Sequence, residues 1–166
     1  MYTVCLGLGS NLGNRLSFLQ QAADEIQKMT TVIALSPVYE AEPVGMESSH
    51  LFYNVALKVE TTLEPHDLLR EIKNIEKNLG RSPHTHMKDR EIDIDILLYN
   101  GLYYEDHVLY VPHPHLSERR FVLTMLNDVA STMVEPISGE SVSELLSKCT
   151  DQSSVQRTTN RIQLSH

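Results

Sequence analysis

The order of hydrophobic and polar positions predicts a fold that alternates strands with helices. Alternating apolar positions bounded by turn residues indicate strands at residues 2–8, 31–39, 51–61 and 90–99. Apolar residues spaced three or four apart indicate helices at residues 15–29, 65–79, 121–129 and 142–146. Asn100-Gly101 is a hairpin signal that leads to a short strand at residues 102–104. The β-α-β-β-α-β order predicts an α+β fold: a ferredoxin-like core with a mainly antiparallel sheet, helices packed on it and C-terminal helical additions.

The strand predicted at residues 90–99 carries acidic residues where strands usually carry apolar ones. Because side chains alternate along a strand, one face is expected to be apolar and the other acidic. The apolar face would consist of Ile92, Ile94, Ile96 and Leu98, and the acidic face of Glu91, Asp93, Asp95 and Leu97. Asp93 and Asp95 would lie roughly 6.5 to 7 Å apart along the strand, a gap suited to carboxylates that hold Mg²⁺. An exposed edge strand with solvated acids explains the same pattern equally well.

Basic residues flank this strand on both sides. Arg81 and Arg90 precede the aspartates, and His113 and Arg119 follow them. Mg²⁺ bridges phosphate oxygens and guanidinium groups neutralise the remaining charge, so the combination is what a nucleoside triphosphate needs. Each arginine taken singly is better explained by a surface ion pair. The hypothesis therefore depends on their convergence in the fold.

Composition and charge exclude several classes of protein. The chain has 166 residues, 41% of them hydrophobic and 22% charged, which is typical of a globular domain that we expect at residues 1–150, with a polar tail at 151–166. A net charge of −8 without a dense basic tract argues against a nucleic-acid partner. The sequence has two cysteines without metal-ligand spacing, no apolar run long enough to span a membrane and no basic leader. These features predict a cytoplasmic protein.

Short motifs occur in a fixed order from about Thr3 to Leu126. They are Gly9-Ser10-Asn11, Tyr39-x-x-x-Pro43-x-Gly45, Phe52-Tyr53-Asn54, Glu76, Gly80-Arg81, Arg90-x-x-Asp93-x-Asp95, Pro112-His113 and Arg119-x-Phe121. No single motif is specific, but the ordered set resembles the hydroxymethyl-dihydropterin pyrophosphokinases of folate biosynthesis. The resemblance implies transfer of the β,γ-pyrophosphoryl group of ATP to the hydroxymethyl group of a reduced pterin, with release of AMP.

The resemblance also implies roles for the charged residues. Asp93 and Asp95 would bind two Mg²⁺ ions, and Arg81, Arg90 and Asp95 would be catalytic. ATP, the co-substrate, would be contacted by Glu76, Arg81, Arg90, His113 and Arg119. From the residues alone, Glu76 beside two lysines on a helix would be a solvated charge, and His113 after a proline could complete a turn. Gly9-Ser10-Asn11 is a turn between strand and helix and is not assigned to phosphate.

The implied pterin site combines aromatic and polar residues. Its members would be Ala41, Glu42, Val44, Phe52, Asn54 and Phe121. Aromatic faces suit a flat heterocycle, but Phe52 and Phe121 taken alone are better explained by core packing. Asn54 is more informative, because an amide in an apolar strand must find hydrogen-bond partners, either on a pterin edge or on the backbone. The implied partners are ATP and a reduced hydroxymethyl pterin, bound by a monomer.

Some positions depart from the family pattern. Ala41 stands where threonine is common, Met87 where an aromatic residue is common, and Glu91 where threonine is usual. The polar loops 44–50 and 82–89 are expected to close over the substrates. Two other functions stay open at this point: a Mg²⁺-dependent nucleotidyl- or phosphotransferase with another acceptor, and a ferredoxin-like ligand-binding module without catalysis.

Overall fold

The computed structural model describes residues 1–44, 46–82 and 88–165. Its strands are β1 (Tyr2–Ser10), β2 (Thr31–Leu35), β3 (Tyr39–Ala41), β4 (Phe52–Thr61), β5 (Asp93–Tyr99), β6 (Tyr104–Glu105), β7 (Tyr110–Val111) and β8 (Val155–Arg157). Its helices are α1 (Arg15–Gln27), α2 (Pro65–Asn78), α3 (Arg120–Ala130) and α4 (Val142–Lys148), with a 3-10 turn at Leu116–Glu118. No helix in this described part of the chain is long and apolar enough to cross a membrane.

The main sheet is antiparallel, with the strand order β5-β1-β4-β3-β8, and β2 also pairs with β4. This arrangement confirms the ferredoxin-like core. The strand predicted at 31–39 is divided into β2 and β3 by Ser36-Pro37, because proline cannot donate a backbone hydrogen bond to a ladder. The Ser36 hydroxyl accepts the Ala56 backbone N–H at 2.8 Å and so bridges the interruption.

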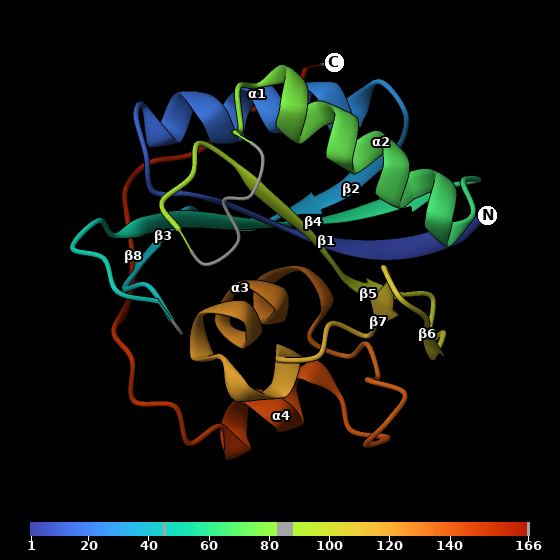
Figure 1. Cartoon of the computed structure of the whole chain (residues 1–166). Coiled ribbons are helices and arrows are strands. Elements are labelled where there is room, and N and C mark those ends of the chain that lie inside the picture. The colour runs from blue at the N-terminus through green and yellow to red at the C-terminus, as the bar shows by residue number, and fades with distance from the viewer. Residues whose placement is uncertain (45, 83–87, 166) are drawn as a thin grey trace.

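Helices cover both faces of the sheet (Figure 1). α1 and α2 lie on one face and bury a core with Leu6, Leu57 and Ile94, whereas α3 and α4 lie on the opposite face and bury a second core. The sheet is therefore the middle of three layers. The aspartate strand β5 is at one edge of this sheet, paired with β1 alone among the described strands.

An irregularity in β5 changes the predicted alternation. The pairing with β1 shifts by one residue, so that Cys5 lies opposite Leu98 but Leu6 lies opposite Ile96. Leu97 is the extra residue of this bulge, and both Leu97 and Leu98 pack on the α3 side. The expectation that Leu98 shares a face with the three isoleucines was therefore wrong, because a bulge reverses the alternation beyond it.

The turn at Asn100-Gly101 forms, but the predicted hairpin does not. Both residues have positive φ, 49° and 71°, and Leu102 N–H donates to the Tyr99 carbonyl at 2.8 Å. The next strand is β6, which pairs with β7 in a separate two-stranded sheet and not with β5.

Residues 151–166, expected to be a polar tail, contribute to the fold. β8 pairs with β3 and extends the sheet, and Ile162 is buried in the core beneath α1. The Gln20 side chain exchanges two hydrogen bonds with the Gln163 backbone, at 2.7 and 2.8 Å. An edge strand needs backbone pairing more than apolar side chains, so the hydropathy pattern of this segment did not reveal it.

Candidate active site

A cavity of about 50 Å³ lies on the α3 side of the sheet, where β1, β4 and β5 meet the start of α3. Most of the predicted site residues line it: Val44, Phe52, Asn54, Arg90, Asp93, Asp95, His113, Arg119 and Phe121. They come from β4, β5, α3 and the segments that precede each of these elements, which are far apart in the sequence. The fold therefore brings together the residues that the motifs singled out.

The floor of the cavity is formed by glycines of β1. Gly9 lies opposite Asn54 on one neighbouring strand and opposite Asp93 on the other, and Gly7 lies opposite Asp95. Directly paired residues of antiparallel strands share a face, so Asn54 and Asp93 form one row with only Gly9 between them, and Asp95 lies in the next row opposite Gly7. A Cβ on Gly9 would lie 2.7 Å from Asn54 Oδ1. The absence of side chains at these two positions keeps the site open.

Asn54 supplies an unused hydrogen-bond donor. Its side chain is only 4% exposed, and its Nδ2 has no hydrogen-bond acceptor among the described residues. A buried amide without a partner is costly, so such a group indicates a ligand in this position. Phe52 and Phe121 line the same cavity, so these aromatic residues border the binding space instead of lying wholly within the core.

The two aspartates are in different electrostatic environments. Asp93, 22% exposed, accepts hydrogen bonds from Arg81 at 3.0 Å and from Arg90 at 3.3 Å. Asp95 is also partly exposed, and desolvation together with the nearby carboxylates of Asp93 and Glu76 raises its pKa to about 8. The site therefore concentrates negative charge that a cation would stabilise.

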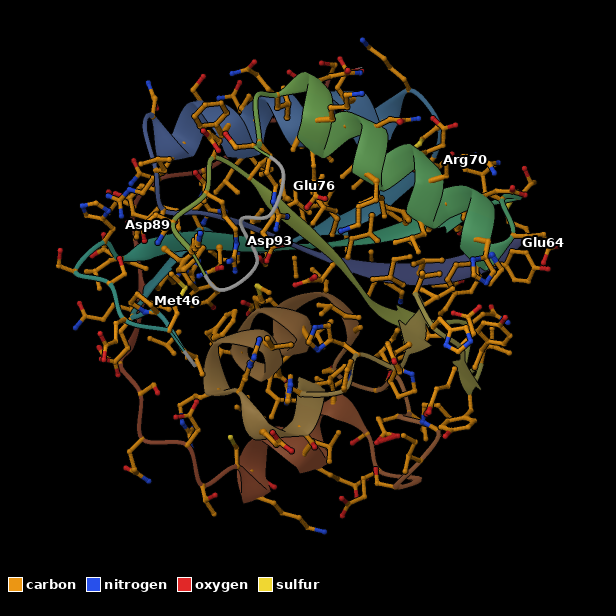
Figure 2. All side chains as sticks on the ribbon, in the orientation of Figure 1. Met46, Glu64, Arg70, Glu76, Asp89 and Asp93 are labelled. Atoms are coloured by element: carbon orange, nitrogen blue, oxygen red, sulfur yellow. The ribbon has the colours of Figure 1, made fainter. Side chains whose placement is uncertain are left out.

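Glu76, on α2, lies behind Asp93 and binds the charged groups of the site. Its carboxylate is 3% exposed, and it accepts hydrogen bonds from Arg81 at 2.7 Å and from the Ile94 backbone N–H at 2.9 Å. Figure 2 shows Glu76 of α2 beside Asp93 of β5. A solvated charge was the simple expectation for Glu76, and it was wrong, because the side chain points under β5 and joins the helix to the strand.

Arg90 connects the two ends of the cavity. Its guanidinium carbon lies 5.3 Å from the centre of the Phe52 ring, and its Nη2 donates to Asp93 at 3.3 Å. The side chain is 13% exposed. A guanidinium group between an aromatic ring and a carboxylate can interact with ligands on either side.

His113 presents a neutral donor to the cavity. Burial, together with the charges of Arg119 and His115, lowers its pKa to about 4. Its Nδ1 accepts the His115 backbone N–H at 3.2 Å, so the ring proton of the neutral imidazole is on Nε2. The turn expected at this residue exists, and it fixes the tautomer.

Four predicted residues lie beside the cavity and not on its described lining. Arg81 and Glu76 lie behind Asp93, as described above. Ala41 is buried in β3 opposite Phe52, and Glu42 accepts the Ser154 backbone N–H at 2.9 Å. The prediction on Met87 falls outside the described residues, as does most of the loop 82–89.

Sequence reasoning missed several lining residues. They are Gly7, Leu8, Gly9, Met46, Leu97, Val122 and Met125. The glycines had a signal, since Gly7-x-Gly9 puts two glycines on one face of a strand, which is typical of close approach by a ligand. Leu97 was predicted on the same face as the two aspartates and Met46 in the loop 44–50, but neither was assigned to the site. Leu8, Val122 and Met125 had no signal, because their positions are those of ordinary core residues.

The donor set at Asp93 and Asp95 fits Mg²⁺ as a partner of phosphate. Within the described residues, no group of three or more His, Cys, Asp or Glu side chains is arranged to hold a metal ion. Mg²⁺ in nucleotide enzymes is held by one or two carboxylates, with substrate phosphates and water as the other ligands. Two adjacent carboxylates that face a cavity lined with basic residues meet that requirement.

Comparisons with known proteins identify relatives of this chain. The family 7,8-dihydro-6-hydroxymethylpterin-pyrophosphokinase (HPPK) matches residues 5–131. The chain is 40% identical over 137 residues to the 2-amino-4-hydroxy-6-hydroxymethyldihydropteridine pyrophosphokinase of Aquifex aeolicus, covering 82% of this chain and 86% of that protein. It is 40% identical over 126 residues to the Bacillus subtilis protein of the same name, covering 75% of each.

Longer proteins contain a similar region. The folic acid synthesis protein of Pneumocystis carinii is 38% identical over 149 residues, which are 89% of this chain but 20% of that protein. A crystal structure of Plasmodium falciparum HPPK-DHPS with pteroate superposes with a TM-score of 0.77 at 17% identity, covering 89% of this chain and 44% of that one. This structure supports the fold, and the sequence matches settle the family. The chain belongs to the 7,8-dihydro-6-hydroxymethylpterin-pyrophosphokinase family.

Proposed function

We propose that the cavity beneath α3 is the site of the family reaction. The chain is an ATP-dependent pyrophosphokinase that transfers a pyrophosphoryl group to hydroxymethyl-dihydropterin in folate biosynthesis. The observation that carries the assignment is the row across β4, β1 and β5, in which Asn54 and Asp93 face one space on either side of Gly9. An acceptor and a nucleotide bound at the two ends would meet over this glycine.

The pterin would occupy the end formed by β4 and α3. Phe52 and Phe121 would contact the faces of the bicyclic ring, and Asn54 would donate from Nδ2 to its edge. Backbone groups of residues 41–44, including Ala41, Glu42 and Val44, would complete the pocket. Val44 and Met46 line the same cavity as Phe52.

The triphosphate would occupy the end formed by β5 and the segment around His113. Asp93 and Asp95 would hold two Mg²⁺ ions, which would neutralise phosphate oxygens and lower the cost of deprotonating the acceptor hydroxyl. His113 would donate from Nε2 to a phosphate oxygen. Arg119, which also lines the cavity, would contact the nucleotide, and Glu76 would support nucleotide binding by holding Arg81 in place.

The reaction itself needs alignment and charge stabilisation more than a covalent intermediate. The hydroxymethyl oxygen forms a bond to the β-phosphorus, the bond from that phosphorus to the bridging oxygen of AMP breaks, and the hydroxyl proton is released. Arg81 and Arg90, held beside Asp93, would neutralise charge on the transferring group. Asp95 completes the catalytic set that we propose.

An assay of AMP formation tests this assignment. Purified protein would be incubated with ATP, Mg²⁺ and hydroxymethyl-dihydropterin, and each component would be omitted in turn. We expect AMP and the pterin diphosphate only in the complete mixture. AMP formation with another acceptor in place of the pterin would favour a different transferase, and tight pterin binding without turnover would favour a binding module.

Gly9→Ala is expected to weaken pterin binding by roughly tenfold, because the new Cβ displaces the Asn54 amide and disturbs its hydrogen bond. ATP affinity should change much less. Fluorescence titration with the pterin measures the first effect, and calorimetry with a non-hydrolysable ATP analogue measures the second. Gly7→Ala adds a Cβ to the same floor, but this Cβ meets Leu97 and Met125 and does not reach Asn54, so it should weaken pterin binding less than Gly9→Ala. Equal pterin affinity in wild type and Gly9→Ala would contradict the role of Asn54.

We also propose that the protein acts as a cytoplasmic monomer. Both cysteines, Cys5 and Cys149, are unpaired, which is the usual state in a reducing compartment. All the residues that we assign to the site lie within residues 1–150, and β8 and Ile162 beyond them belong to the same sheet and core.

A further inference from the structure

The turn after β1 makes contacts that the reaction above does not use. Asn11 is 3% exposed, and its side-chain Oδ1 accepts the Arg90 backbone N–H at 2.8 Å. Its Nδ2 donates to Asp89 Oδ1 at 2.8 Å and to the His50 carbonyl at 3.2 Å. One buried amide therefore contacts both loops that lie beside the cavity.

Asp89 is the second centre of this network. It accepts hydrogen bonds from the Ser48 hydroxyl at 2.6 Å and from Asn11 at 2.8 Å, both on Oδ1, and its Oδ2 lies 2.7 Å from His50 Nδ1. The Ser48 hydroxyl, followed by His50 and Asn11, lowers the pKa of Asp89, so this carboxylate is ionised at neutral pH. Figure 2 shows Asp89 and Met46 on neighbouring loops at the same side of the molecule.

These contacts fix the residue that joins the two ends of the cavity. The Arg90 backbone is held by Asn11 on both sides, since the Asn11 N–H also donates to the Arg90 carbonyl at 3.2 Å. The Arg90 side chain then extends between the Phe52 ring and Asp93. A shift of the loop at Asp89 would therefore move a guanidinium group within the cavity.

We propose that Asn11, Ser48, His50 and Asp89 form a latch that couples the loop 46–50 to the loop 88–90, with Asn11 as a positioning residue for Arg90. The inference rests on the proposed function for its effect on turnover. The coupling itself is a property of the protein without ligands. It gives the Gly9-Ser10-Asn11 motif a role beyond the turn.

Hydrogen exchange on the protein without ligands tests the coupling. Ser48→Ala removes the hydroxyl of loop 46–50 that donates to Asp89. We expect the backbone amides of residues 88–90, on the other loop, to exchange roughly tenfold faster. Ser49→Ala is the matched control, because Ser49 makes no side-chain hydrogen bond within the described part of the chain; it should leave residues 88–90 unchanged. A change confined to the mutated loop, or an equal change in the control, would overturn the latch.

A polarity exchange tests the positioning role. Asn11→Asp keeps an acceptor for the Arg90 N–H but places a second carboxylate against Asp89, so we expect kcat to fall about 50-fold with less than about threefold change in either KM. The additional change Asp89→Asn lets the amide at position 89 donate to the carboxylate at position 11, the reverse of the wild-type hydrogen bond. The double variant should therefore have a kcat at least tenfold higher than Asn11→Asp alone. A double variant no better than the single one would refute the positioning role. If wild type fails to form AMP, the proposed function is wrong. The hydrogen-exchange measurement still decides whether the latch couples the two loops.

Discussion

Asp95→Asn is expected to lower kcat at least about 1,000-fold, because Asn cannot supply the negative charge that holds a divalent cation against the phosphates, a contribution of several kcal/mol. The thermal unfolding temperature without ligands should stay the same or rise. Desolvation and the carboxylates of Asp93 and Glu76 raise the pKa of Asp95 to about 8, so its carboxyl is mostly neutral at pH 7 without ligands, and a neutral amide in its place removes no favourable charge interaction. Steady-state AMP formation measures the first effect, and differential scanning calorimetry measures the second.

Glu91→Gln provides the control for this prediction. Glu91 lies two residues before Asp93, outside the described lining of the cavity, so removing its charge should change kcat less than about twofold. Activity of Asp95→Asn within tenfold of wild type would mean that Asp95 does not hold a catalytic cation. An equal loss in both variants would indicate a general effect of charge near β5.

The sequence predicted the strand at β5 because an unbroken apolar face marks a strand whatever its other face carries. The same alternation placed Asp93 and Asp95 together correctly, since the bulge at Leu97 comes after them. It placed Leu98 wrongly, because one inserted residue in a ladder leaves no trace in hydropathy. Local pattern thus predicts a face only up to the first irregularity.

Long-range partners were harder to predict. Lys77 follows Glu76 and Lys73 lies three residues before it, as would suit a solvated residue, yet the tertiary fold turns Glu76 beneath β5. The polar residues of β8 are in the sheet because β3 offers a free edge, which no property of residues 155–157 reveals. Asn54 was recognisable in advance, because an amide within an apolar strand demands an explanation in any fold.

The other large effect is expected from Glu76→Ala. The variant leaves Arg81, 15% exposed, with one carboxylate fewer, and it leaves the Ile94 N–H without its side-chain acceptor. Loss of one member of a buried ion pair should lower the free energy of unfolding by about 3 kcal/mol. Displacement of Arg81 should also lower kcat by about 100-fold. Urea unfolding and steady-state kinetics measure the two effects.

A double-mutant cycle with Arg81→Ala separates the two roles open to Glu76. If Glu76 acts by positioning Arg81, Glu76→Ala should cost little further kcat once Arg81 has been removed, and the KM for ATP should change similarly in all variants. If Glu76 instead contacts the nucleotide directly, the KM for ATP should rise with Glu76→Ala in both backgrounds. Glu71→Gln, an exposed acid on the same helix, should alter neither stability nor kinetics. The buried position of Glu76 and its 2.7 Å contact with Arg81 favour the first outcome. The Glu76 carboxylate already accepts hydrogen bonds from an arginine, a lysine and a backbone N–H. It therefore has little capacity left for a ligand.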